Sequence, residues 1–109
     1  MSEKKVLLID YDAPSLEKLS KLLKTNKYHV VKAVDGKAGY DAYITEKPDL
    51  VVLEAMLPKL HGFDLCQKIC KDSKGRVPII VITGLYKGPK YRQGSLNGLG
   101  ASDFFEKAR

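Results

Sequence analysis

Apolar residues gather in short runs that are separated by longer segments of mixed character. Three such runs, at residues 5–9, 50–53 and 77–82, are rich in valine, isoleucine and leucine and end at polar residues. They are too short to be helices, so the pattern predicts buried strands. Weaker runs at residues 28–34 and 101–105 predict two further strands. The continuous apolar character of residues 77–82 predicts burial on both faces of that strand.

Helical patterns fill the segments between these runs. Residues 13–26 place leucines at helical spacing with lysines opposite them, which predicts an amphipathic helix. Asp12 is a candidate N-cap for this helix. Further helices are predicted at 37–47 and 63–72, and the irregular segment after the fourth strand holds at most a short helix at 91–99.

Polar side chains follow the predicted strands. Asp10 and Asp12 come after the first strand, Glu54 after the third, Thr83 after the fourth and Lys107 after the fifth. Alternating strands and helices predict parallel βαβ units, in which the carboxyl ends of all strands lie at one edge of the sheet. Ligands collect at that edge in open α/β sheets, so these residues are the candidate site.

Length and composition predict one globular domain, spanning residues 1–109. The chain is 44% hydrophobic and 29% charged, as is usual for globular proteins. No apolar stretch approaches the roughly 20 residues of a membrane-spanning helix, and the N-terminus is too polar for a secretory signal. We therefore expect a cytoplasmic protein without membrane contacts.

The basic charge and the two cysteines give little indication of a further functional site. A net charge of +6 would favour an acidic partner, but the lysines are scattered rather than clustered. A nucleic-acid contact would have to use Lys87, Lys90, Tyr91 and Arg92. Cys66 and Cys70 share a helix face and have no second pair to complete a zinc site, so we expect two small buried residues.

Four segments together resemble a known family. In order they read VLLIDYD, PDLVVLEAMLPKLHGFDLC, VPIIVITG and GASDFFEKA. This order resembles the receiver (CheY-like) domain of bacterial two-component response regulators, over essentially the whole chain. The resemblance implies an α/β, flavodoxin-like, doubly wound parallel sheet of five strands in the order 2-1-3-4-5. Such domains end in a fifth helix, which has no counterpart here, so we expect a single receiver domain cut from a longer response regulator.

The resemblance also implies roles for individual residues. Glu54 stands at the phosphoacceptor position, and Asp10 and Asp12 form the acidic pocket. A Mg²⁺ ion would be held by Asp10, Asp12, Glu54 and the backbone carbonyl of Met56. Thr83 and Lys107 would contact the phosphoryl group, and Phe104 would be the aromatic residue that moves with Thr83. His61 is interpreted as a turn residue rather than a ligand.

Three positions depart from the family pattern. The acceptor is usually aspartate, and the extra methylene of Glu54 advances the carboxylate by on the order of 1 Å, a misplacement that can cost roughly 100-fold in rate. Tyr11 replaces a second acidic residue, so together with Glu54 it is expected to weaken Mg²⁺ binding. Ala108 replaces a proline, so the peptide bond before it is predicted to be trans.

These observations support three hypotheses. The leading one is a receiver module that acts by protein–protein contact without phosphorylation, a pseudo-receiver rather than an enzyme. Its partners would be a histidine kinase or a downstream output domain, and a homodimer is left open. The alternative is a working Mg²⁺-dependent phosphoacceptor in a phosphorelay. A nucleic-acid contact ranks below both, because receivers usually leave DNA binding to a separate domain.

Overall fold

The structure of the chain is a computed structural model, and it describes residues 4–54, 57, 61–83 and 103–106. Strands and helices alternate along the chain. In order they are β1 (Lys5–Ile9), α1 (Ala13–Thr25), β2 (His29–Ala33), α2 (Gly36–Glu46), β3 (Leu50–Glu54), α3 (Gly62–Ser73), β4 (Ile79–Thr83) and β5 (Asp103–Glu106). No helix in the described ranges is long and apolar enough to cross a membrane.

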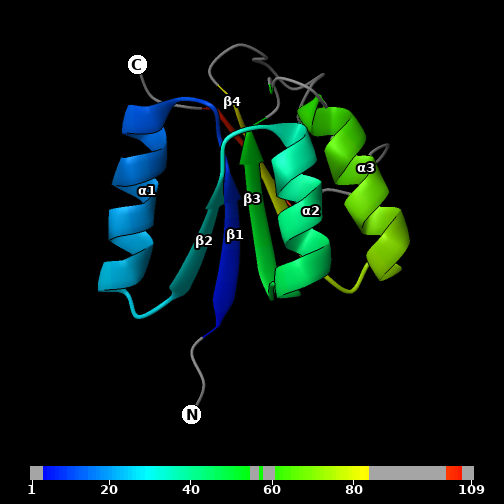
Figure 1. Cartoon of the computed structure of the whole chain (residues 1–109), viewed down its shortest axis with the longest axis horizontal. Coiled ribbons are helices and arrows are strands. Elements are labelled where there is room, and N and C mark those ends of the chain that lie inside the picture. Colours follow the sequence, from blue (N-terminus) through cyan, green and yellow to red (C-terminus); the bar gives the residue numbers. More distant parts are fainter. Residues whose placement is uncertain (1–3, 55–56, 58–60, 84–102, 107–109) are drawn as a thin grey trace.

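The strands form one parallel sheet in the order β2-β1-β3-β4-β5. Helix α1 covers one face, and α2 and α3 cover the other (Figure 1). This confirms the predicted flavodoxin-like sheet, including the place of β2 at its edge. The strand order reverses between β1 and β3, and the crevice at such a reversal is where ligands bind in open α/β sheets.

The predicted element boundaries agree with the structure to within about two residues. Strand β1 has the predicted bounds. The fourth strand begins at Ile79 rather than at residue 77, because the pairing of β3 with β4 starts at Val51 and Ile79. Pro78 has no N–H to donate, although its carbonyl accepts a 3.0 Å bond from the N–H of Val51. The short helix predicted at 91–99 lies outside the described residues.

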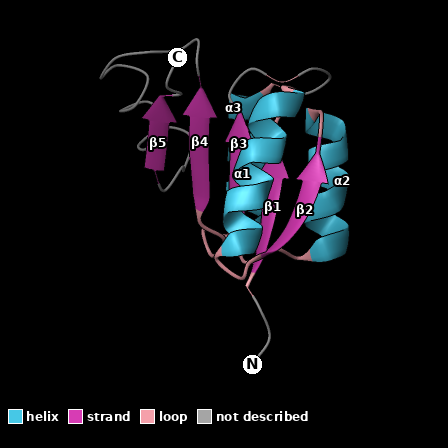
Figure 2. Cartoon of the chain, turned by 90° about the vertical axis from the view of Figure 1, so that its left-hand side faces the viewer, coloured by secondary structure: helices cyan, strands magenta, loops and turns pink. Residues whose placement is uncertain are grey.

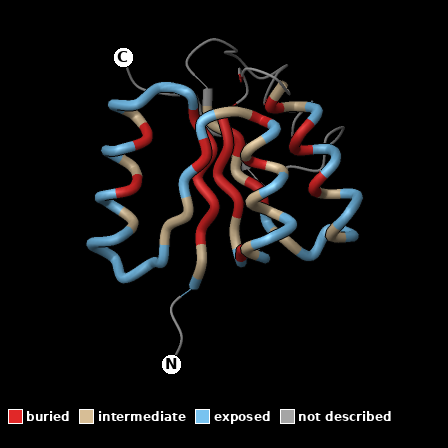
Figure 3. The backbone as a smooth tube through the Cα atoms, in the orientation of Figure 1, coloured by how far each residue is buried: buried red, intermediate tan, exposed pale blue. Residues whose placement is uncertain are grey.

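The core has a larger and a smaller part on opposite faces of the sheet. Buried residues such as Leu7, Leu53 and Leu65 form the larger part, under α2 and α3. The smaller part, under α1, consists of Val6, Leu8, Leu16 and Val52. Figure 3 shows that the buried residues are concentrated in the central strands and on the inner faces of the helices.

The prediction that β4 is buried on both faces is wrong for one of them. Ile79 and Val81 are buried, whereas Ile80 and Ile82, which point to the opposite face, are only half-buried. Among the described helices, only α1 lies on that second face. It lies over the β1 side of the sheet, and β4 and β5 stand beside it (Figure 2). The apolar run therefore predicted the strand correctly. It also predicted full burial of a face of β4 that is only half-buried.

Helix α2 approaches β1 closely at Gly39. A Cβ atom at Gly39 would lie 2.7 Å from Cδ1 of Ile9 and 3.1 Å from both its Cγ1 and its Cγ2. Ile9 is fully buried, so its side chain has little room to move away. Glycine at this position therefore fixes how near the helix packs to the sheet.

We predict that Gly39→Ala lowers the free energy of unfolding by about 1–3 kcal/mol, the usual cost of overpacking a core. The measurement is the urea midpoint at unchanged m-value. Ile9→Val removes the Cδ1 atom, so the double variant should lose less stability than the sum of the two single variants. Strictly additive losses would contradict the proposed contact.

Candidate functional site

Two carboxylates meet at the point where the strand order reverses. Asp10 directly follows β1, and Glu54 is the last residue of β3. Ile9 is paired with Leu53, so the next residues, Asp10 and Glu54, lie side by side on strands about 4.8 Å apart. Side chains alternate along a strand, which places both carboxylates on the face that carries α1. The sequence predicted this juxtaposition correctly.

Both carboxylates are buried. Asp10 is 0% exposed and Glu54 is 3% exposed. Burying a carboxylate is costly unless hydrogen bonds or cations compensate it. One oxygen of Asp10, Oδ1, accepts a 3.0 Å hydrogen bond from the N–H of Asp12. This bond joins the end of β1 to the start of α1, so Asp10 also organises the turn.

The two residues after Asp10 lie at the surface. Tyr11 is 52% exposed, so its ring is not part of the core. Asp12 is also exposed and occupies the N-cap position of α1, but its side chain makes no capping hydrogen bond. Asp12 is therefore the N-cap residue of α1, as predicted, but its carboxylate does not supply a capping bond.

The caps of the other two helices differ from this one. The side chain of Asp35 accepts a 2.7 Å bond from the N–H of Ala38 at the start of α2. His61 is the N-cap of α3, and its Nδ1 accepts a 3.2 Å bond from the N–H of Phe63. His61 is thus a structural residue of the turn, as predicted, and its Nδ1 is engaged there. Its capping role was not predicted, because histidine is an uncommon cap residue.

Strands β4 and β5 reach the same edge of the sheet. Thr83, the last residue of β4, is paired with Glu106, and Phe104 is paired with Val81. The backbone of Thr83 therefore lies at the carboxyl end of β4, and that of Phe104 lies within β5. Lys107, Ala108 and Met56 lie outside the described residues. Their roles, and the trans peptide bond before Ala108, stay predictions.

The residues at the edge fit a Mg²⁺ site only in part. Mg²⁺ prefers hard oxygen ligands, and the adjacent carboxylates of Asp10 and Glu54 are of that type. Within the described ranges, however, no three His, Cys, Asp or Glu side chains gather closely enough to hold a metal.

Sequence reasoning missed one polar contact between helices. The hydroxyl of Tyr40 on α2 donates to Oδ2 of Asp72 on α3, and this hydrogen bond raises the pKa of Tyr40. The Nζ atom of Lys68 lies 4.5 Å from the centre of the Tyr40 ring. Each residue alone reads as a solvated helix residue, so no sequence signal linked them. The contact joins α2 to α3.

The two cysteines were predicted to be buried on one helix face. Cys66 is fully buried, and Cys70 is half-buried. Burial, with a smaller effect of the neighbouring Cys70, raises the pKa of Cys66 to about 12. A thiol with such a pKa is protonated at neutral pH and unreactive, which fits a packing role.

We predict that the two aspartates at helix starts differ in their contribution to stability. Asp35→Ala should lower the free energy of unfolding by at least about 1 kcal/mol, because it removes a capping bond. Asp12→Ala should change it by less than about 0.5 kcal/mol. Urea unfolding of both variants measures the difference, and a loss for Asp12→Ala equal to that for Asp35→Ala would show that the carboxylate of Asp12 does stabilise the start of α1.

Comparisons with known proteins agree with this geometry. The sequence profile of the response regulator receiver domain matches residues 6–109. The transcriptional regulatory protein PhoP of Bacillus subtilis, named for alkaline phosphatase synthesis, is 35% identical over 104 residues, which are 95% of this chain and 42% of that protein. The DNA-binding dual master transcriptional regulator RpaA of Synechocystis is 34% identical over 104 residues, 94% of this chain and 42% of that protein. The chain thus spans about two fifths of the length of these two relatives.

Solved structures share the fold. The BeF3-activated N-terminal receiver domain of RstA from Klebsiella pneumoniae has a TM-score of 0.83 at 30% identity, covering 97% of this chain and 87% of that one. A CheY-like receiver domain protein from Methanospirillum hungatei has a TM-score of 0.88 at 28% identity, covering 99% and 84%. The chain therefore belongs to the receiver domain family of two-component response regulators.

Proposed function

We propose that this receiver domain signals by protein–protein contact without depending on phosphorylation. The observation that carries the proposal is Glu54, a buried glutamate at the end of β3 beside Asp10. The family's acceptor at this position is an aspartate. Phosphoryl transfer requires in-line geometry, and a carboxylate displaced by on the order of 1 Å can lose roughly 100-fold in rate. Glu54 would therefore accept a phosphoryl group poorly, although it stands at the position where the family has its acceptor aspartate.

The longer side chain also carries its charge further along the edge. We infer that Glu54 reaches toward Lys107 and Thr83, the residues that would contact a phosphoryl group. A fixed network of these three groups would hold the edge in one arrangement. A phosphoryl group carries about −1.5 to −2 charges and three acceptor oxygens. One carboxylate therefore imitates the phosphorylated state only in part.

Tyr11 supports the same proposal. Mg²⁺, when bound in a receiver, neutralises the phosphoryl oxygens during transfer. An exposed tyrosine stands where a second acidic residue is usual, so Asp10 and Glu54 are the buried carboxylates among the residues whose burial the structure describes. Asp12 would have to supply a further oxygen from the surface. Weak Mg²⁺ binding by these residues would lower phosphorylation further.

The relatives suggest where such a module acts. Proteins that match this chain over most of its length are transcriptional regulators more than twice as long. We propose that residues 1–109 are the receiver domain of a longer cytoplasmic regulator. Its partners would be a histidine kinase or an output domain, and the domain itself would have no catalytic role.

The alternative is a working phosphoacceptor that uses Mg²⁺. The adjacent buried carboxylates of Asp10 and Glu54 favour it, because such a pair is the core of an oxygen-ligand site. In that case Asp10 would hold the ion and Glu54 would accept the phosphoryl group. The two candidate functions differ in whether Glu54 becomes covalently modified.

We predict that the native chain gains no phosphoryl adduct when it is incubated with acetyl phosphate and Mg²⁺, whereas Glu54→Asp gains one. Intact mass spectrometry makes the measurement, because aspartate restores the position of the acceptor oxygen. Glu17→Asp, the same change on the exposed face of α1, is the matched control and should remain unlabelled.

An adduct on the native chain that disappears in both Asp10→Asn and Glu54→Gln would overturn the proposal in favour of the alternative. If neither the native chain nor Glu54→Asp is labelled, phosphorylation-independent signalling stands. The inference that only the acceptor has changed would then be wrong.

A further inference from the structure

The edge of the sheet opposite Asp10 and Glu54 is basic. In this parallel fold α1, α2 and α3 all end at that edge, and a lysine with positive φ follows each of them: Lys27 (φ 68°), Lys47 (φ 49°) and Lys74 (φ 56°). Glycine is the usual residue in this left-handed conformation, because side chains disfavour it. A lysine there is compatible with the negative end of the helix dipole.

A small apolar groove opens at this edge. Tyr43, Ile44, Lys47, Pro48 and Val77 line it, and its volume is about 260 Å³. The groove lies where the end of α2 meets the residues that lead into β3 and β4. This volume is below the roughly 300 Å³ at which small-molecule sites begin. It suits one or two apolar side chains rather than a cofactor.

One residue of the groove is apolar and exposed, and two others contact the core. Ile44 is 52% exposed, although it sits on a helix that packs against the core. Tyr43 and Val77 are half-buried and contact the larger core. A partner that covered Ile44 would remove apolar surface from water without any rearrangement of the core.

The cation of the groove, and two cations close to it in sequence, form no ion pair within the described part of the chain. Lys47 lines the groove, and Lys74 and Arg76 precede Val77 closely in sequence. The nearby acid Glu46 is already engaged, because its Oε1 lies 3.3 Å from Nζ of Lys5. The ion pairs between described residues are Lys5–Glu46 and Lys32–Glu17, so Lys47, Lys74 and Arg76 take part in none.

We propose that this groove is a docking site for a protein segment that carries an apolar side chain flanked by carboxylates. The apolar side chain would cover Ile44, and the carboxylates would face Lys47 and the cations that precede Val77. Nucleic acid could satisfy the cations, but its apolar groups are few and small, such as the thymine methyl group, and would fill the groove poorly. The site lies at the edge opposite Asp10 and Glu54, so a partner could bind whether or not Glu54 is modified.

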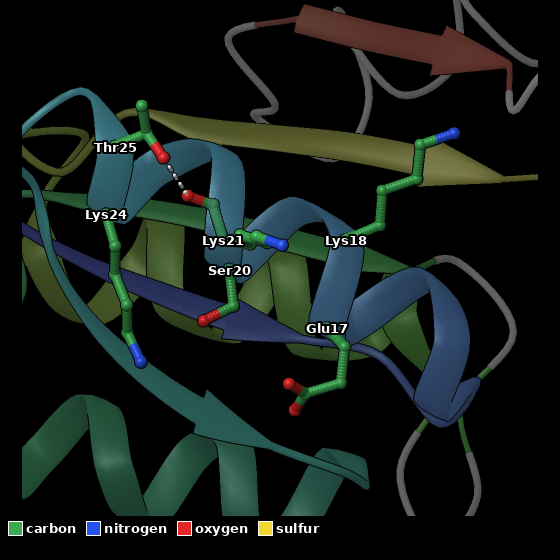
Figure 4. Close-up of a pocket in the computed structure, with 6 residues that line it drawn as sticks. All are labelled: Glu17, Lys18, Ser20, Lys21, Lys24 and Thr25. Carbon is green, nitrogen blue, oxygen red and sulfur yellow. Dashed lines mark hydrogen bonds between the residues drawn. The ribbon is translucent and has the colours of Figure 1, made fainter.

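A second basic surface, on α1, can be compared with the groove. A shallow hollow of about 580 Å³ lies along α1 and is lined by Glu17, Lys18, Ser20, Lys21, Lys24 and Thr25. Figure 4 shows these polar side chains spreading to both sides of the helix. The residues that line this hollow are all polar or charged, unlike Tyr43, Ile44, Pro48 and Val77 in the groove, and Glu17 already pairs with Lys32 at 2.8 Å. Helix α1 also carries an exposed leucine, Leu22, which is 59% exposed and does not line the hollow.

The test uses synthetic peptides as probes. One fluorescent peptide alternates glutamates with leucines, a second replaces the leucines by alanines, and a third replaces the glutamates by lysines. Binding to the whole chain is measured by anisotropy and by amide NMR shifts. We predict that the glutamate–leucine peptide binds and shifts Ile44, Lys47 and Val77. The alanine peptide should bind at least about tenfold more weakly, because burial of leucine drives docking.

Matched variants locate the site. Ile44→Ser and Lys47→Glu should each weaken binding of the glutamate–leucine peptide about fivefold or more. Leu22→Ser removes an apolar residue of similar exposure from α1, and Lys27→Glu makes the same charge change at another left-handed lysine. Both controls should bind as the native chain does. Lys47→Gln serves as a second variant that removes the charge without adding a new one.

Several results would overturn the proposal. Equal affinity for the glutamate–leucine and glutamate–alanine peptides would mean that the protein recognises only the charge of the peptide. Tighter binding of a short DNA duplex, lost in Lys47→Glu, would make the edge a polyanion site. Unchanged peptide binding in folded Ile44→Ser, or no binding at millimolar peptide, would mean that the groove docks no such segment.

Discussion

The parallel pairing of β1 with β3 is the constraint on which the candidate site depends. It aligns Ile9 with Leu53 and thereby brings Asp10 next to Glu54 at the reversal of strand order. The two carboxylates are buried there, in a position that costs free energy and contributes no apolar packing. Asp10 also organises the turn into α1, but two adjacent buried carboxylates at a reversal of strand order are typical of a functional site.

The fold could be predicted from the sequence because its signals are local and repeated. Short β-branched runs alternate with helical patterns, and that alternation leaves few topologies open. The strand order itself came from the resemblance to receivers rather than from periodicity. The error at β4 has a physical reason. An apolar run reports that residues avoid water, but it does not report how much of each face a helix covers, as Ile80 and Ile82 illustrate.

The site could be predicted only as far as backbone position determines it. The places of Asp10 and Glu54 follow from where the strands end. The role of Asp12 did not follow, because a residue at an N-cap position can cap a helix or leave its side chain in solvent, and rotamers decide between the two. The bond from Tyr40 to Asp72 joins residues 32 positions apart, so it depends on how α2 packs against α3.

The central claim is that Glu54 holds the carboxyl edge in one state without a phosphoryl group. The most direct test is the amide NMR spectrum of the native chain, recorded with Mg²⁺ and with beryllofluoride as a phosphoryl analogue. We predict that the resonances of Asp10, Leu53 and Ile82 do not move on addition of the analogue. Saturable shifts of these resonances, lost in Asp10→Asn, would contradict the claim, because they would mean that the edge still switches.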